Sequence, residues 1–429
     1  MHALRPSHRR LGARPALAAL LLLTAAARWV AAQALPIPLA DPSVRRAMEA
    51  MPGLQGWTLA QQISICEIPA PPFKEQARAA EFQRRLIALG YRDARIDAEG
   101  NVIATIGAGR GPVVLIAGHL DTVFPEGTDV RTTRTGDRIA GAGIGDDCRG
   151  LAVILTLARV LKEQRVTPRG TVHLVGNVGE EGPGNLRGVR HLLTKEFAGT
   201  VNYFISVDGA GDGRIVSRAV GSHRYNVSFK GPGGHSYGAF GMANPMHAMG
   251  RAIAKIGDLR VPTNPRTTFN VGIVRGGTSV NTITPLAQME VDMRSESPEA
   301  LAAIDAQIRA AIAAGVAEEL ARWPNSRASV TVTYDTIGIR PTGGQSDDAP
   351  IVQTAWAAIE ALGWLPATSA SSTDANLPIA MGIPAITING GGRSTGAHGT
   401  EEAYTETPDS FKGPQLALLL VTALAGVSR

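Results

Sequence analysis

The amino-acid sequence predicts an α/β protein with a mostly parallel sheet, helices on both faces of that sheet, and an inserted ferredoxin-like α+β domain. Two observations lead to this prediction. Up to Ser217, short continuous apolar runs alternate with helical patterns, which is typical of a parallel sheet that is buried on both faces. After Ser217, strands of alternating polarity follow the order strand-helix-strand-strand-helix-strand, the order of a ferredoxin-like unit.

The elements of the first segment follow from its periodicity. Apolar residues at helical spacing predict helices at residues 59–65, 74–89, 150–161 and 188–197. Apolar runs rich in β-branched residues predict strands at 101–106, 113–117, 171–177 and 203–207. Because these strands and helices alternate along the chain, the strands are expected to form a sheet that helices cover on both sides.

The second segment interrupts this pattern. Alternating residues predict strands at 222–229, 267–274, 287–294 and 328–334, with helices at 242–256 and 299–320. Helical spacing then resumes at 351–362, and a further strand is expected at 385–389. The predicted domains are therefore a main domain made of residues 33–217 and 336–429, and an inserted domain at residues 218–335.

The first 32 residues have the layout of a secretory signal. Four arginines precede a short apolar run at residues 16–27, and small residues follow at 30–32. The run is too short for a membrane anchor, which would have to cross about 30 Å of hydrocarbon. The chain is therefore expected to be exported, to the periplasm or the medium. The pair Arg9-Arg10 leaves twin-arginine export open.

The charge of the mature chain excludes some partners. The signal contains five arginines and no acidic residue, so its removal leaves 37 of the 42 basic residues against 37 acidic ones. The basic isoelectric point therefore comes from the signal. A net charge near zero gives no reason to expect binding to nucleic acid or to an anionic membrane surface.

Five short segments carry histidines and carboxylates in the order that a two-metal hydrolase site needs. They are residues 118–121, 145–147, 179–182, 206–209 and 396–399, and three of them follow apolar runs. Because strand ends meet at one edge of an α/β sheet, these side chains are expected to lie close together. The donor atoms are nitrogen and oxygen without a thiolate, which suits two zinc ions, with cobalt or manganese as alternatives.

The first two segments each leave an alternative open. His119 can bind a metal while Asp121 orients it through the second ring nitrogen, although a lone His-x-Asp is weak support. In the pair Asp146-Asp147, a carboxylate can bridge two cations. The alternative is that this pair simply caps the following helix.

The third segment is the most specific. Adjacent carboxylates at Glu180 and Glu181 repel each other unless a cation is near. One can bind the metal, and the other can take a proton from a metal-activated water; a solvated charged loop is the alternative. Asp208 after an apolar strand and His398 in a glycine-rich loop complete the set.

These segments, in this order and with this insertion, resemble the M20 metallopeptidases over residues 45–425. That group contains glutamate carboxypeptidase, peptidase T, succinyl-diaminopimelate desuccinylase and the aminoacylases. The resemblance implies a cis peptide bond after the bridging aspartate. It assigns catalysis to Glu180 as general base with Asp121 as a supporting carboxylate, and it assigns the metal ligands as His119, Asp146, Glu181, Asp208 and His398.

The inserted domain resembles the lid and dimerisation domain of that family. The resemblance implies that His235 reaches the site of a partner subunit in a homodimer and stabilises the developing oxyanion. Asn281 and Arg294 resemble lid residues that hold the substrate, and the arginine fork suits a carboxylate. Gly391, in the run 390–392, resembles part of a loop that approaches the substrate. Each of these could instead have a structural role.

The expected function is hydrolysis of amide bonds in short peptides. Aspartate at position 208 favours this reading, because the carboxypeptidase and deacylase branches that the chain resembles usually have glutamate there. The alternatives are an N-acyl amino acid deacylase or a carboxypeptidase of the same family, and a catalytically inactive binding protein. The intact Glu180 argues against the inactive protein.

The two cysteines, Cys66 and Cys148, are expected to be unpaired buried thiols. Cys148 lies two residues after Asp146, so a disulfide would constrain the predicted metal site. Export nevertheless leaves a disulfide open. Neither cysteine belongs to a Cys-x-x-Cys pair, which argues against a zinc-thiolate site.

Overall fold

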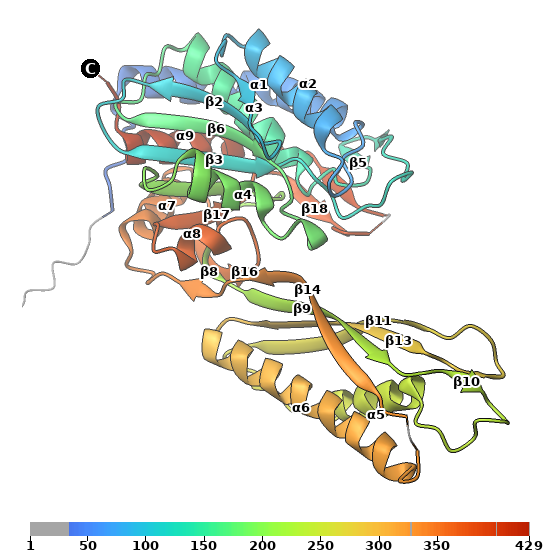
Figure 1. The fold of residues 1–429 in the computed structure, drawn as a ribbon. Coiled ribbons are helices and arrows are strands. Elements are labelled where there is room, and N and C mark those ends of the chain that lie inside the picture. The colour runs from blue at the N-terminus through green and yellow to red at the C-terminus, as the bar shows by residue number, and fades with distance from the viewer. Residues whose placement is uncertain (1–33, 327, 400, 429) are drawn as a thin grey trace, which may run out of the picture. The chain divides into compact units, whose positions relative to one another are not determined.

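The structure is a computed structural model that describes residues 34–326, 328–399 and 401–428 (Figure 1). It confirms the predicted fold class, an α/β sheet with an inserted α+β unit. The predicted signal at residues 1–32 lies outside the described residues and stays a prediction, as do the limits of the domains.

The central sheet has the strand order β1-β2-β6-β3-β7-β17-β8-β15, and β16 pairs with β8. Its middle strands, β6, β3, β7 and β17, run parallel. β1, β2, β8 and β15 join in antiparallel fashion, and β16 pairs with β8 in parallel. The strands are β1 (Arg95–Ile96), β2 (Val102–Gly107), β3 (Val113–His119), β6 (Thr171–Asn177), β7 (Tyr203–Val207), β8 (Arg214–Ala219), β15 (Gly343–Gly344), β16 (Ala367–Ser371) and β17 (Ala385–Ile388).

Helices cover both faces of this sheet because its strands are apolar on both sides. One face packs against α1 (Pro42–Cys66), α2 (Gln76–Ala88), α3 (Cys148–Glu163), α7 (Pro350–Ala361) and α9 (Lys412–Ala425). The other face packs against α4 (Arg187–His191), the π-helical turn Leu192–Glu196 and α8 (Asn376–Ala380). Along β3, Val114 and Ile116 face the first layer and Leu115 the second, as the period of a strand requires.

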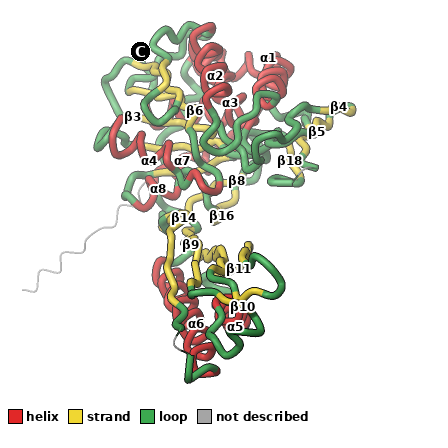
Figure 2. Tube along the Cα trace, turned by 45° about the vertical axis from the view of Figure 1, so that its right-hand side comes forward, coloured by secondary structure: helices red, strands yellow, loops and turns green. Residues whose placement is uncertain are grey.

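The inserted unit is a second sheet with the order β11-β13-β9-β14, and all its pairs are antiparallel. Its elements are β9 (Gly221–Lys230), α5 (Pro245–Gly257), β11 (Thr267–Gly276), β13 (Leu286–Ser295), α6 (Pro298–Arg322) and β14 (Thr331–Arg340). Helices α5 and α6 pack together on this sheet (Figure 2). Phe229, Met289 and Ile308 are part of a hydrophobic core of its own. The order of elements is ferredoxin-like.

Helix α6 begins where Ser297 accepts a hydrogen bond from the backbone N–H of Ala300, a typical N-cap. By length and composition alone, α6 could cross a membrane. In this fold, however, Leu301, Ile304 and Ile308 on one side of the helix are buried in the core of the inserted unit.

Two small sheets add contacts that the sequence did not predict. In the first, β10 (Gly234–His235) pairs with β12 (Thr282–Ile283). The second has the order β18-β19-β5-β4, with β18 (Arg393–Thr395), β19 (Ala403–Thr405), β5 (Arg138–Ala140) and β4 (Thr133–Thr135). The pairing of β19 with β5 joins the segment before Asp146 to the segment after His398.

Cys66 and Cys148 form a disulfide with a Cα–Cα distance of 5.4 Å, so the prediction of unpaired thiols is wrong. Cys66 is the last residue of α1 and Cys148 the first of α3. These helices pack against each other, which brings the two cysteines together. The predicted helices at 59–65 and 150–161 end or begin near the two cysteines. The sequence pattern could not show that these helix ends meet.

We expect the double variant Cys66→Ser, Cys148→Ser to be less stable than the wild type by about 2–4 kcal/mol, because the disulfide closes a long loop in the unfolded chain. The two residues are separated by 82 positions. Urea unfolding followed by circular dichroism measures the difference, with the reduced wild type as a second reference. Equal midpoints for the oxidised wild type and the variant would contradict a stabilising role.

Candidate metal centre and substrate cavity

The parallel strands of the central sheet deliver the predicted ligands to one edge. His119 is the last residue of β3, Glu180 and Glu181 follow the end of β6, and Asp208 follows the last residue of β7. His398 lies in the loop after β18. Because β6, β3, β7 and β17 are parallel, their carboxyl ends share the same edge, where α/β proteins commonly place their sites.

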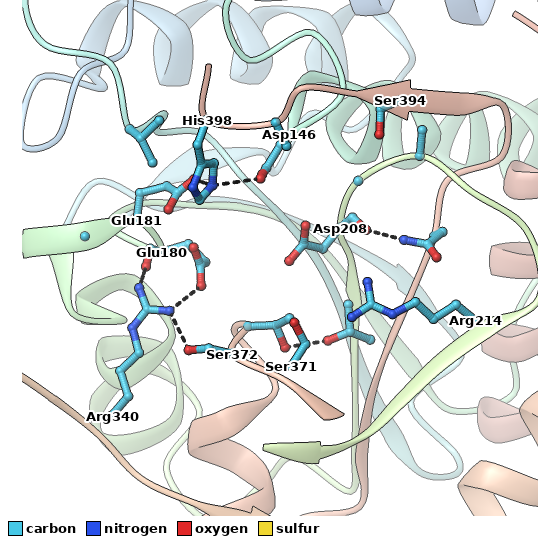
Figure 3. A pocket seen from close by; sticks show the side chains of 18 of the residues that line it. Asp146, Glu180, Glu181, Asp208, Arg214, Arg340, Ser371, Ser372, Ser394 and His398 are labelled. Atoms are coloured by element: carbon cyan, nitrogen blue, oxygen red, sulfur yellow. Dashed lines mark hydrogen bonds and ion pairs between the residues drawn. The ribbon is translucent and has the colours of Figure 1, made fainter. Parts of the chain in front are cut away.

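Asp146 contacts both predicted histidine ligands, and Figure 3 shows its contact with His398. Its Oδ1 is 2.9 Å from Nε2 of His119, and its Oδ2 is 3.2 Å from Nε2 of His398. Nε2 of His398 is also 3.0 Å from Oε1 of Glu181. One carboxylate thus offers one oxygen toward each histidine, which is the arrangement expected of a residue that bridges two cations.

The chemistry of these donors fits metal ions. Ligand atoms of His119, Asp146 and Glu181 all lie within 4.8 Å of one another. Hydrogen bonds to Asp146 and Glu181 raise the pKa of His398 to about 10. Burial, together with the charge of Asp146, raises the pKa of Asp208 to about 7. The carboxylates of the cluster therefore favour a positive charge beside them, which divalent cations would supply. Nitrogen and oxygen donors of this kind suit zinc.

Asp121 supports the site in a different way from the one predicted. Its carboxylate accepts hydrogen bonds from the backbone N–H groups of Glu180 (3.0 Å) and Glu181 (2.8 Å). Nδ1 of His119 donates to the main-chain carbonyl of Asp121 at 3.0 Å, whereas the carboxylate is 3.7 Å away. The side chain of Asp121 therefore fixes the glutamate loop, and its backbone orients His119.

In the pair Asp146-Asp147, Asp147 caps the following helix, and Asp146 is the residue placed to bridge cations. The peptide bond between them is cis, as the resemblance implied. Asp147 caps α3 by accepting from the N–H of Gly150 at 2.9 Å, and it also accepts from the N–H groups of His119 (3.0 Å) and Gly209 (3.2 Å). Asp147 thus holds the ends of β3 and β7 together while Asp146 faces the histidines.

Glu402 is a site residue that sequence reasoning missed. Its carboxylate is buried and accepts hydrogen bonds from the backbone N–H groups of Gly143 (3.0 Å), Gly145 (2.8 Å) and Asp146 (3.0 Å). Burial raises the pKa of Glu402, and these hydrogen bonds oppose that shift. The turn that carries Asp146 is therefore bound by a residue more than 250 positions later in the sequence. No local signal in the sequence could have indicated this contact.

Glu180, the predicted general base, is buried and paired with Arg340, another residue that the sequence did not single out. Nη1 of Arg340 donates to Oε1 of Glu180 at 2.9 Å and to Oγ of Ser372 at 3.0 Å, and Nη2 donates to the carbonyl of Glu180. Burial raises the pKa of Glu180, and the charge of Arg340 opposes that rise. The arginine thereby fixes the position of the carboxylate.

These groups line a cavity of about 490 Å³. Four guanidinium groups share it with the acidic cluster. The charged residues that line it are Asp146, Glu180, Glu181, Asp208, Arg214, Arg224, Arg294, Arg340 and His398. The cavity thus contains an acidic part suited to cations and a basic part suited to an anionic substrate.

Of the four residues predicted on the lid or in the glycine loop, the structure brings only Arg294 to this cavity. His235 is exposed on β10. The carbonyl of Asn281 accepts a hydrogen bond from the backbone N–H of Ser236, the residue after His235. Gly391 has a φ of +81°, and a Cβ there would lie 2.4 Å from the carbonyl of Ser410. The described contacts give Gly391 a role in close packing.

Comparisons with known proteins agree with this geometry. The model of the peptidase family M20/M25/M40 matches residues 115–421. Carboxypeptidase G2 of Pseudomonas sp. strain RS-16 is 29% identical over 234 residues, which are 51% of this chain and 54% of that protein. The chain is thus matched to about half the length of this relative.

Solved structures share the fold. The aminopeptidase PepT of Bacillus cereus superposes with a TM-score of 0.67 at 23% identity, over 86% of this chain and 99% of that one. The YXEP protein of Bacillus subtilis, described as a dinuclear metal binding peptidase from family M20, superposes with a TM-score of 0.61 at 19% identity, over 86% and 98%. Because the family match covers most of the chain, this protein belongs to peptidase family M20/M25/M40, a family of peptide and amide hydrolases.

Proposed function

We propose that this protein is a dinuclear zinc-dependent hydrolase that cleaves amide bonds of short peptides. The observation that carries the proposal is the position of Asp146, which offers one carboxylate oxygen toward His119 and the other toward His398. Glu180 is a further buried carboxylate at the site, and it is not one of the proposed metal ligands. A bridging carboxylate with a separate base is what metal-assisted hydrolysis needs.

The chain's own residues divide the work of the reaction. Two zinc ions would supply Lewis-acid activation of a water molecule and of the amide carbonyl. The residues that would hold them are His119, Asp146, Glu181, Asp208 and His398. Glu180 would take the proton from the attacking water and deliver it to the leaving amine. Arg340, which holds the Glu180 carboxylate at 2.9 Å, would keep it aimed during both transfers.

His235 is proposed to act in a homodimer that forms through the inserted unit. Nδ1 of His235 accepts hydrogen bonds from the N–H groups of Tyr237 (3.2 Å) and Gly238 (3.3 Å). Nε2 is therefore the nitrogen that carries the proton and can donate to a developing oxyanion. Because His235 is exposed and does not line the cavity of its own chain, a partner subunit is its proposed target.

A second candidate is an N-acyl amino acid deacylase or a carboxypeptidase. Arg294 lines the cavity with a guanidinium that can bind a free carboxylate, and carboxypeptidase G2 is a relative by sequence. Export remains part of the proposal for both candidates. The disulfide between Cys66 and Cys148 supports it, because stable disulfides belong mostly to oxidising compartments.

The first experiment is a hydrolysis panel with the zinc-loaded mature protein. We expect cleavage of free tripeptides. A chelator should abolish it, because the proposed mechanism needs the cations to activate the water. The panel also contains the same tripeptides with a blocked N-terminus and a set of N-acyl amino acids. Cleavage restricted to free amines would identify an aminopeptidase, whereas cleavage of the blocked or acylated set would favour the second candidate. Turnover that a chelator does not affect would contradict both.

A further inference from the structure

We propose that Arg214 binds a second anionic group of the substrate, so that the preferred substrates carry an acidic side chain close to the scissile amide bond. This inference rests on the proposed function and names its substrate class. Arg214 is the first residue of β8 and lines the cavity six positions after the predicted ligand Asp208.

The four arginines of the cavity differ in their partners. Arg340 is paired with Glu180. Arg224 and Arg294 share one carboxylate, that of Asp292, at 2.8 and 2.9 Å. Within the described part of the chain, Arg214 forms no ion pair, and its Nε donates to Oγ of Ser369 at 3.0 Å. Arg214 is exposed, and that hydrogen bond leaves the two terminal amino groups of its guanidinium for a ligand.

Arg214 and Arg340 lie in different parts of the cavity. Figure 3 shows Arg214 and Arg340 entering the cavity from opposite sides, with Asp208 above them and Ser371 and Ser372 between them. Arg340 is engaged with the predicted base, so it serves the reacting end of the substrate. Asn389, which donates to the carbonyl of Asp208, lines the same cavity as Arg214.

The pairing of the four arginines favours a substrate with two negative groups. Arg340 is paired with Glu180, and Arg224 and Arg294 share Asp292. Arg214 has no carboxylate partner among the described residues. A substrate with a single carboxylate at Arg294 would leave Arg214 unpaired, whereas an acidic side chain would give it a charged, two-pronged partner.

The test compares substrates that differ only in glutamate against glutamine, placed on either side of the scissile bond of dipeptides and N-acyl amino acids. For the wild type we expect kcat/KM to favour glutamate by about tenfold or more at one of these positions. Arg214→Gln should remove this preference by lowering kcat/KM for the glutamate member alone. Arg214→Lys should restore part of it, because the charge returns without the fork.

Arg218→Gln is the matched control. Arg218 is an exposed arginine of the same strand, β8, that does not line the cavity, and its loss should leave the glutamate preference unchanged. If Arg214→Gln lowers both members of a pair equally, or neither, the inference is overturned while the proposed function stands.

A binding measurement tests the inference without turnover. Isothermal titration calorimetry compares glutarate, which has two carboxylates, with butyrate, which has one. The wild type should bind glutarate at least about fivefold more tightly, and Arg214→Gln should lose this advantage while Arg218→Gln keeps it. Equal affinities for the two acids in the wild type would overturn the inference whether or not the enzyme cleaves the panel. Absence of cleavage together with a retained advantage would instead reject only the proposed reaction.

Discussion

Replacement of Glu180 by glutamine is expected to lower kcat by about 10²–10⁴-fold or more, because the variant has no group to take the proton from the attacking water. Glutamine has the same shape and can still accept from Nη1 of Arg340 at the position of Oε1. The cations should remain bound, since Glu180 is not a predicted ligand. The measurement is kcat together with zinc content per chain.

Glu163→Gln on α3 is a suitable control, because it removes an exposed carboxylate paired with Arg159 on the outside of the helix. Full activity in Glu180→Gln would refute the mechanism. Loss of zinc from that variant would instead make Glu180 a ligand and require another residue as the base.

The variant His235→Ala is expected to be nearly inactive, with kcat lowered by about 10²–10³-fold, as when one oxyanion donor is removed. It should remain dimeric in sedimentation velocity. Mixing it with Glu180→Gln chains should restore up to about a quarter of the wild-type activity, because a mixed dimer contains one site with both groups intact. Two inactive proteins would thus become active together.

His247→Ala removes another exposed histidine of the inserted unit and should stay active. If subunit exchange is verified with a labelled chain and no activity returns, His235 does not act across the interface. Full activity of His235→Ala on its own would remove this residue from the mechanism.

The sequence predicted the central strands well, because strands buried on both faces are continuous apolar runs. Residues 113–117, 171–177 and 203–207 all became strands. The start of α1 was missed, because Pro52, Gly53 and Gly56 interrupt its helical spacing. Helix α9 was missed for another reason: it is buried along most of its length, so it has no polar face to reveal a period.

In the candidate site, too, residues with a local sequence pattern could be predicted, and residues that depend on distant contacts could not. The residues predicted as ligands could be singled out because each follows a strand or a glycine-rich turn and matches a known pattern. Arg340, Glu402 and the role of Asp147 were missed, because they depend on contacts between distant segments. Glu402 binds the turn at Gly145 across 257 positions of sequence, and Arg340 binds Glu180 across 160. Such partners have no local signature.

The hydrogen bonds between Glu402 and the turn at residues 143–146 also set the order in which the candidate site can be assembled. Four of the five ligand segments are synthesised in the first half of the chain, but β17, β19, His398 and Glu402 emerge from the ribosome only at its end. Until then the turn at residues 143–146 lacks three of its hydrogen bonds. A growing chain therefore lacks the candidate centre until the segment that carries His398 and Glu402 has been synthesised.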